Sequence, residues 1–329
     1  MDAIALQMAI EFNNSPRNRN MLWGGQRILN LAAGDTAFSD PAFEFAGGDT
    51  AWLRWYLNVA SLTSGWPVWR TPRATGEGFT QSVGGANQAY GLGTLSAAGG
   101  SNGAGWAPQG VIGIPHADSP EWTRRAVICD GDSIIAGTGD TADTATGNIA
   151  YSKGLVDRDG YLIPYVNQGR AQDQLSFQVD ANLTPRWRKQ LMWAYATHYL
   201  CNFGTNDIAN GRTLSQMQAD AAYVWGRARK YGLKVAQILV TPRQLSVGGA
   251  VHSDWAPGGL RDQWNAWVRT QVGVLIDDVI DPNPYVESAT THGAWASDTY
   301  TPDGLHMLPA GYAAANQAVT AWAQTRVAV

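Results

Sequence analysis

The sequence predicts an α/β fold, in which a doubly wound parallel sheet of five strands is flanked by helices and preceded by a β-rich domain. Beyond about residue 124, short apolar runs alternate with longer segments of helical periodicity, which is the order of a parallel sheet. These apolar runs show little alternation, as expected when helices cover both faces of a sheet. Residues 1 to about 120 are instead rich in Gly, Trp, Thr and Ala. We therefore expect a β-rich accessory domain at 1–122 and an α/β domain at 123–329.

The first half contains turn signals and one candidate strand. The related pieces "AAGDTAF" at 32–38 and "AGGDTAW" at 46–52 are typical of Gly-Asp turns that lead into strands. The segment "TAWLRWYLNVAS" at 50–61 alternates apolar and polar residues in part, as a half-buried strand does. The glycine-rich segment at 97–110 predicts a loop. These features favour a sandwich-like domain, for which carbohydrate binding or a place beside a substrate cleft is the function to test.

The second half supplies the strands and helices of the parallel sheet. Apolar runs predict five strands, which lie within 125–132, 161–169, 197–207, 233–242 and 274–282. Periodic apolar positions predict three helices, at 213–232, 258–273 and 308–324. The first of these helices has a Ser/Thr start and a glycine stop, which are common helix boundaries.

Small polar motifs follow the first three strands. Ser133 follows the first strand in "DGDS", Gly169 follows the second in "NQG", and Asn206 follows the third in "GTND". Asp303 and His306 stand in "PDGLHML", just before the last helix. Functional residues of such sheets lie at the carboxyl ends of the strands. A strand order of 2-1-3 would therefore bring the first three loops together around Ser133.

These four blocks resemble those of the SGNH hydrolases, also called GDSL esterases and lipases. The family is named for the Ser, Gly, Asn and His of its blocks, which match Ser133, Gly169, Asn206 and His306 in the same order. The resemblance covers roughly residues 125 to 325 and leaves residues 1–120 aside. It implies a flavodoxin-like sheet and a serine esterase that works through an acyl-enzyme, with no metal or organic cofactor.

The chemistry of such a site follows from its residue types. A serine hydroxyl is a weak nucleophile until a base takes its proton, and His306 is the predicted base for Ser133. Asp303 lies three residues before His306, so one turn can place its carboxylate beside the imidazole. The resemblance implies an oxyanion hole formed by the backbone N–H groups of Ser133 and Gly169 and the side-chain amide of Asn206.

The sequence departs from the family pattern in the second block. Family members often have another glycine three residues after Gly169, where this chain has Gln172. The loop is therefore expected to have its own shape, with Arg170 facing the substrate. Arg243 and Trp255, after the fourth strand, are further candidates for substrate contacts because long loops often carry such residues.

Several of these residues also have a structural interpretation. Taken alone, Ser133 reads as a helix cap, Asn206 as a turn residue and Asp207 as another cap. The four blocks together favour the catalytic interpretation of Ser133 and Asn206. Asp130 and Asp132 are interpreted as structural residues that bind loop amides.

The remaining histidines and aromatic residues do not predict a second site. Four histidines have no partner at an informative spacing, so no metal cluster is predicted from them: His116, His198, His252 and His292. Asp277 and Asp278 are interpreted as structural residues at a strand end. Most of the early tryptophans are expected to fill the core of the β-rich domain, and some to line a cleft: Trp23, Trp52, Trp55, Trp66, Trp69, Trp106 and Trp122.

Composition restricts the class of protein further. The net charge of −4 argues against a nucleic-acid surface, and no apolar run of about 18 residues predicts a membrane span. Cys129 and Cys201 are expected to be buried free thiols rather than a disulfide. The N-terminus lacks the pattern of a secretory signal, which favours a cytoplasmic location unless export follows another route or a signal has been removed, as in an extracellular or virion-associated protein.

Together these features predict an esterase for small-molecule or glycan esters, with O-acetyl groups on a carbohydrate as the favoured substrate. A general carboxylesterase, arylesterase or lipase is the first alternative. An alternative from another class is a carbohydrate-binding or adhesion fibre protein with a vestigial hydrolase site. The intact blocks argue against this second alternative.

Overall fold

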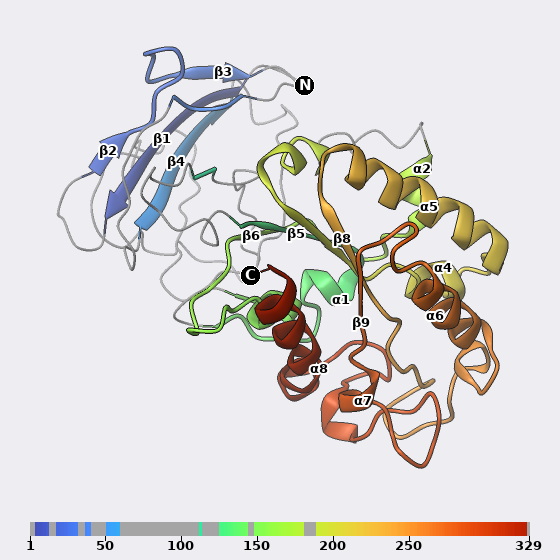
Figure 1. Ribbon diagram of the computed structural model, residues 1–329. Coiled ribbons are helices and arrows are strands. Elements are labelled where there is room, and N and C mark those ends of the chain that lie inside the picture. The colour runs from blue at the N-terminus through green and yellow to red at the C-terminus, as the bar shows by residue number, and fades with distance from the viewer. Residues whose placement is uncertain are drawn as a thin grey trace. The chain divides into compact units, whose positions relative to one another are not determined.

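The computed structural model divides the chain into two compact units, Met1–Pro108 and Gln109–Val329 (Figure 1). The residues that the structure describes are 4–12, 18–31, 37–40, 51–59, 112–113, 125–143, 148–180 and 189–327. The predicted boundary between residues 122 and 123 lies outside them, as do the loop at 97–110 and all but the last two residues of each predicted turn segment, 32–38 and 46–52.

The first unit contains a four-stranded antiparallel sheet around its first strand. Strand β4 pairs with the whole of β1, from Ile4 opposite Val59 to Phe12 opposite Ala51, while β2 and β3 pair with opposite ends of β1. The predicted strand at 50–61 is confirmed as β4, whereas β1 was not predicted from the sequence. The strands are β1 (Ile4–Phe12), β2 (Asn18–Asn20), β3 (Leu29–Leu31) and β4 (Ala51–Val59).

The second unit is built on a five-stranded parallel sheet with the order β6-β5-β7-β8-β9. This order confirms the predicted doubly wound sheet, with the second and third strands on either side of the first. All five predicted strands are present, each shorter than its apolar run. They are β5 (Val127–Asp130), β6 (Tyr165–Asn167), β7 (His198–Cys201), β8 (Lys234–Ile238) and β9 (Asp278–Ile280).

The predicted helices are confirmed as the three longest of the described residues. They are α5 (Leu214–Lys230), α6 (Leu260–Thr270) and α8 (Pro309–Trp322). Thr213 and Gln216 form a capping box at the start of α5, since each side chain accepts a hydrogen bond from the backbone N–H of the other. Short helices fill the loops: α1 (Ser133–Ala136), α2 (Leu175–Val179), α4 (Thr205–Ala209) and α7 (Asn283–Val286).

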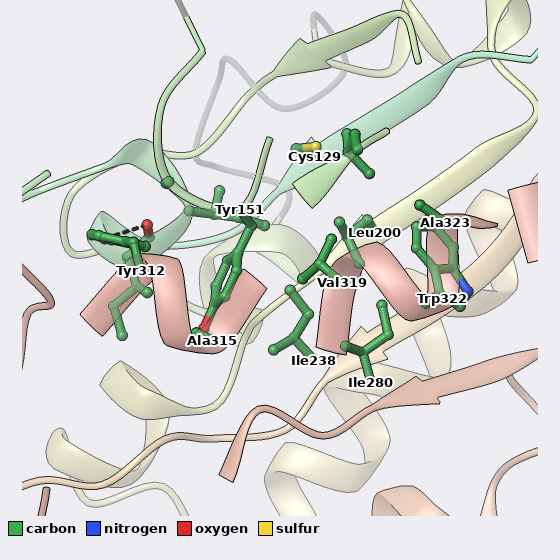
Figure 2. Packing of buried hydrophobic residues seen from close by; sticks show 14 of the residues in the cluster. Cys129, Tyr151, Leu200, Ile238, Ile280, Tyr312, Ala315, Val319, Trp322 and Ala323 are labelled. Atoms are coloured by element: carbon green, nitrogen blue, oxygen red, sulfur yellow. Dashed lines mark hydrogen bonds between the residues drawn. The ribbon is translucent and has the colours of Figure 1, made fainter. Parts of the chain in front are cut away.

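Helices cover both faces of the parallel sheet, which explains why nearly every position of its three central strands, β5, β7 and β8, is buried. Figure 2 shows Val319 and Trp322 of α8 packed near Leu200, Ile238 and Ile280 from three strands. The opposite face forms a second core with α5 and α6, which includes Ile128, Tyr199, Val235, Trp225 and Trp264. The two cores together hold the strand ends, and therefore the loops that follow them, in place.

Both cysteines are free and buried, as expected. Within the described ranges, no helix combines the length and the apolar character needed to cross a lipid bilayer.

Candidate active site

Ser133 lies at the start of α1, immediately after β5. Glycine is required at position 131, because a Cβ there would lie 1.8 Å from Asn202 Oδ1. Asp132 caps α1 by accepting a hydrogen bond of 2.9 Å from the Ile134 N–H. The strand therefore ends in a tight turn that brings Ser133 to the carboxyl edge of the sheet, with 8% of its surface exposed.

Asp132 and Asn202 join the ends of the two central strands, β5 and β7. Asn202 Nδ2 donates to Asp132 Oδ1 at 2.8 Å, and the Asp132 N–H donates to Asn202 Oδ1 at 3.2 Å. Burial raises the pKa of Asp132 to about 6, although hydrogen bonds from Asn202 and the Ile134 N–H oppose this shift. The structural interpretation of Asp132 agrees with these contacts. Asn202 was missed from the sequence, although a polar residue directly after an apolar strand was a signal for it.

His306 connects Ser133 to Asp303. His306 Nε2 lies 2.8 Å from Ser133 Oγ, and His306 Nδ1 lies 2.6 Å from Asp303 Oδ2. The second oxygen of Asp303 accepts the N–H groups of Leu305 and His306 at 2.9 and 2.8 Å, which fixes the loop around the carboxylate. Burial raises the pKa of Asp303, but the hydrogen bonds from His306 and Leu305 outweigh it and hold the pKa below its usual range.

Helix α8 holds the loop of His306 against the helix of Ser133. Tyr312 in α8 donates its hydroxyl to the Ile134 carbonyl at 2.8 Å and contacts the Thr138 carbonyl at 3.2 Å. Ser133 and His306 lie 173 positions apart in the sequence. The hydrogen bond between α8 and α1 helps to bring the two side chains together.

Gly169 packs directly against α1. A Cβ on Gly169 would lie 2.6 Å from the Ala136 nitrogen and 2.3 Å from Ile135 Cγ2, so only glycine fits. Its N–H donates to Asn167 Oδ1 at 2.9 Å, while Asn167 Nδ2 donates to the Ile135 carbonyl at 2.8 Å. The N–H that was predicted as an oxyanion donor thus donates to Asn167 in this structure, and Gly169 in addition packs closely against α1.

The loop after Gly169 contains a left-handed residue that is not glycine. Gln172 has a φ of 64°, a conformation that glycine adopts with less strain. The Arg170 N–H donates to the Gly131 carbonyl at 2.9 Å, and the Asp173 N–H donates to the Arg170 carbonyl at 3.1 Å. The loop is tied in this way to the turn before Ser133, and Arg170 is exposed.

Asn206 lies in the first turn of α4, after β7. Its Nδ2 donates to the Asp173 carbonyl at 3.1 Å, which uses one of the two N–H groups of the amide. Asp207 is fully buried and accepts the N–H groups of Leu175 and Ser176. Asp207 thus caps a helix, as the structural interpretation predicted. The helix that it caps is α2 and not α4, to which it belongs.

The two candidates after the fourth strand lie in different environments. Trp255 is fully buried and donates its indole N–H to the Thr241 carbonyl at 2.9 Å, so the prediction that it contacts the substrate is wrong for this structure. The guanidinium of Arg243 lies over the Trp255 ring, 5.1 Å from its centroid, and the residue as a whole is half-buried. Trp255 therefore supports Arg243 from beneath.

The other described histidines lie outside the Ser133 cluster. His198 is buried at the start of β7, and His292 Nε2 lies 2.8 Å from an oxygen of Asp262. His252 packs edge-on against the Trp255 ring, and His116 lies outside the described residues. In the part of the chain that the structure describes, no group of three or more His, Cys, Asp and Glu side chains is arranged to hold a metal ion.

A parallel sheet with Ser133 at its carboxyl edge and His306 beside it defines a protein of the SGNH type. The sequence model of the GDSL-like lipase/acylhydrolase family matches residues 129–314, and the chain belongs to this family. No curated protein shows a significant match to the chain.

Solved structures with similar folds include a GDSL-like lipase and an acetyl xylan esterase. The lipase, from Bacteroides thetaiotaomicron, is 15% identical with a TM-score of 0.41, and the match covers 62% of this chain and 90% of the lipase. The esterase is a variant from Geobacillus stearothermophilus, 14% identical with a TM-score of 0.41. The match covers 60% of this chain and 94% of the esterase.

Proposed function

We propose that the protein is a serine esterase in which Ser133 is the nucleophile, His306 the general base and Asp303 the residue that orients the imidazole. The observation that carries this proposal is the unbroken line of contacts from Ser133 Oγ through both ring nitrogens of His306 to Asp303, at 2.8 and 2.6 Å. His306 takes the proton of Ser133 as the hydroxyl attacks the ester carbonyl, and Asp303 stabilises the imidazolium that forms.

The oxyanion that forms next needs hydrogen-bond donors at the same edge of the sheet. The Ser133 N–H belongs to the first turn of α1, where backbone N–H groups have no acceptor within the helix. Asn206 keeps one amide N–H after its bond to Asp173. These two donors form the proposed oxyanion hole, and loss of one such donor costs about 100- to 1,000-fold in kcat.

The proposed substrates are short acyl esters, above all O-acetyl groups on a carbohydrate. The limited exposure of Ser133, at 8%, favours a small acyl group. The exposed Arg170 and the partly exposed Arg243 offer hydrogen-bond donors to an oxygen-rich alcohol portion such as a sugar. The tryptophan-rich first unit adds aromatic rings of the kind that stack on sugars, which supports a carbohydrate substrate.

Hydrolysis of p-nitrophenyl acetate, butyrate and octanoate, together with an acetylated xylo-oligosaccharide, tests this proposal. We expect kcat/KM to fall with acyl length and acetate to be released from the glycan. Ser133→Ala and His306→Ala should each reduce kcat by at least about 1,000-fold. Wild-type turnover by Ser133→Ala would reject the nucleophile, and a preference for octanoate would reject the short-acyl assignment in favour of a lipase.

A further inference from the structure

A buried lysine bridges two buried carboxylates beside the candidate active site. Lys189 Nζ lies 2.7 Å from Asp130 Oδ1 and 2.8 Å from Asp173 Oδ2. Asp130 is 1% exposed and Asp173 is 5% exposed, while the lysine side chain is 18% exposed. The Tyr199 hydroxyl donates to the second oxygen of Asp130 at 3.0 Å.

Such a cluster is costly to bury, so its position in the fold is informative. Charged groups lose their hydration when they are buried, and a buried ion pair frequently adds little net stability for this reason. Burial lowers the pKa of Lys189, but the two carboxylates outweigh burial and raise it above its ordinary value. The ammonium therefore stays charged between its two partners.

Both partners of Lys189 lie beside the candidate active site, one at the end of a strand and one in a loop. Asp130 is the last residue of β5, three positions before Ser133, and its Oδ1 accepts the Gly131 N–H at 2.9 Å. Asp173 follows the left-handed Gln172, and its backbone carbonyl accepts Asn206 Nδ2 at 3.1 Å.

The backbone of Lys189 holds the same loop from a second direction. Its carbonyl accepts Gln168 Nε2 at 2.8 Å, and Trp193 donates its indole N–H to Gln168 Oε1 at 3.2 Å. Both ends of the loop from Gln168 to Asp173 are thus bonded to the segment that begins at Lys189. An ion pair next to Gln172 also offsets the strain of a left-handed residue, which persists only where surrounding contacts hold it.

We propose that Lys189 is a positioning residue of the esterase. Through Asp173, it fixes the carbonyl that orients the Asn206 amide, so that the free N–H of this amide meets the oxyanion. This inference rests on the proposed function. It assigns Lys189 no contact with the substrate, and therefore predicts a change in kcat rather than in KM.

A double-mutant cycle tests whether Lys189 acts through Asn206. We expect Lys189→Met to lower kcat for p-nitrophenyl acetate by about 10- to 100-fold, with KM within about twofold. The reason is that a misplaced amide N–H weakens binding of the oxyanion but not of the uncharged ester. In the Asn206→Ala background, where this donor is absent, the same substitution should lower kcat by less than about threefold.

Lys234→Met is the matched control, because Lys234 pairs with Asp277 at the start of β8, away from the carboxyl edge of the sheet. It should leave kcat and KM unchanged. If Lys189→Met does not fold, the cycle is run with Asp173→Asn, which keeps the backbone carbonyl but removes the ion pair, and the same coupling is expected.

An equal loss of kcat in both backgrounds would overturn the inference, because Lys189 would then act independently of Asn206. A loss confined to KM would overturn it as well. If Asn206→Ala alone leaves kcat unchanged, the proposed oxyanion hole is wrong. If Ser133→Ala stays active, the proposed function itself fails, so the failures of the two proposals are distinguishable.

Discussion

Gln172 shows how a single backbone angle is maintained beside the candidate site. A left-handed conformation costs a residue with a Cβ about 1–3 kcal/mol, whereas glycine adopts it freely but loses more chain entropy on folding. Gln172→Gly should therefore raise the free energy of unfolding by about 1 kcal/mol, measured by urea denaturation. Ala219→Gly, at an exposed position of α5, is the control and should lower it by about 1 kcal/mol. A loss of stability in Gln172→Gly would show that the glutamine side chain contributes more than the strain costs.

His198 makes a second residue-level prediction, on the response to acid. Burial, followed by the charge of Arg125, lowers the pKa of His198 to about 4, from 6.5 for an ordinary histidine. The folded state thus prefers neutral His198, and its contribution to stability is complete above pH 6.5 and is lost as the pH falls toward 4. This loss amounts to about 3 kcal/mol.

The variant His198→Gln cannot titrate and should escape this loss. We expect the stability difference between wild type and variant to change by about 3 kcal/mol between pH 6.5 and pH 4, measured by urea denaturation at each pH. Asp132 and Asp207, whose pKa values burial raises to about 6, favour folding as the pH falls. Both carboxyls remain in the variant, so their effect cancels in the difference. A difference that does not change with pH would contradict the lowered pKa of His198.

At the scale of elements, the site depends on close packing between α1 and the loop after β6. Gly169→Ala would place a methyl group 2.6 Å from the Ala136 nitrogen, so we expect a destabilisation of about 1–3 kcal/mol and a lower kcat. Gly226→Ala in α5 is the matched control, because a Cβ there meets no atom within 4 Å. This control should raise stability by about 1 kcal/mol without changing kcat. Calorimetry and ester hydrolysis measure both effects, and equal behaviour of the two variants would refute the packing role of Gly169.

The elements that the sequence predicted well are those whose signal is local. Helix α5 carries a periodic apolar face and a capping box, and the five strands of the parallel sheet carry continuous apolar runs. The same holds for Ser133 and His306, which short motifs identify. Strand β1 was missed, although its apolar residues Leu6, Met8 and Ile10 stand at alternate positions and are buried.

The contacts that were not predicted join residues that lie far apart in the sequence. The packing of Gly169 against Ala136 and the pairing of Asp132 with Asn202 depend on how closely two segments approach, which spacing along the chain does not encode. Lys189 follows the same pattern, since its partner Asp130 lies 59 positions earlier in the chain. Motifs thus identified the candidate reacting groups, whereas the contacts that hold them became visible only in the structure.

At the scale of the whole molecule, the two cores of the second unit enclose both thiols. Cys129 belongs to one core and Cys201 to the other, and burial raises the pKa of each thiol above its ordinary value. We expect no reaction with a thiol-specific chromogenic reagent under native conditions, and two thiols per chain after unfolding in guanidinium. Rapid labelling of the native protein would show that one of the cores opens readily.

The long separation between Ser133 and His306 has a consequence for how the protein matures. The proposed nucleophile and its proposed base lie within hydrogen-bond distance when α8 is docked on α1 through Tyr312. A refolding chain can complete its central strands and still be inert. Recovery of turnover after dilution from denaturant should therefore follow the docking of α8 on α1 rather than the formation of the central strands.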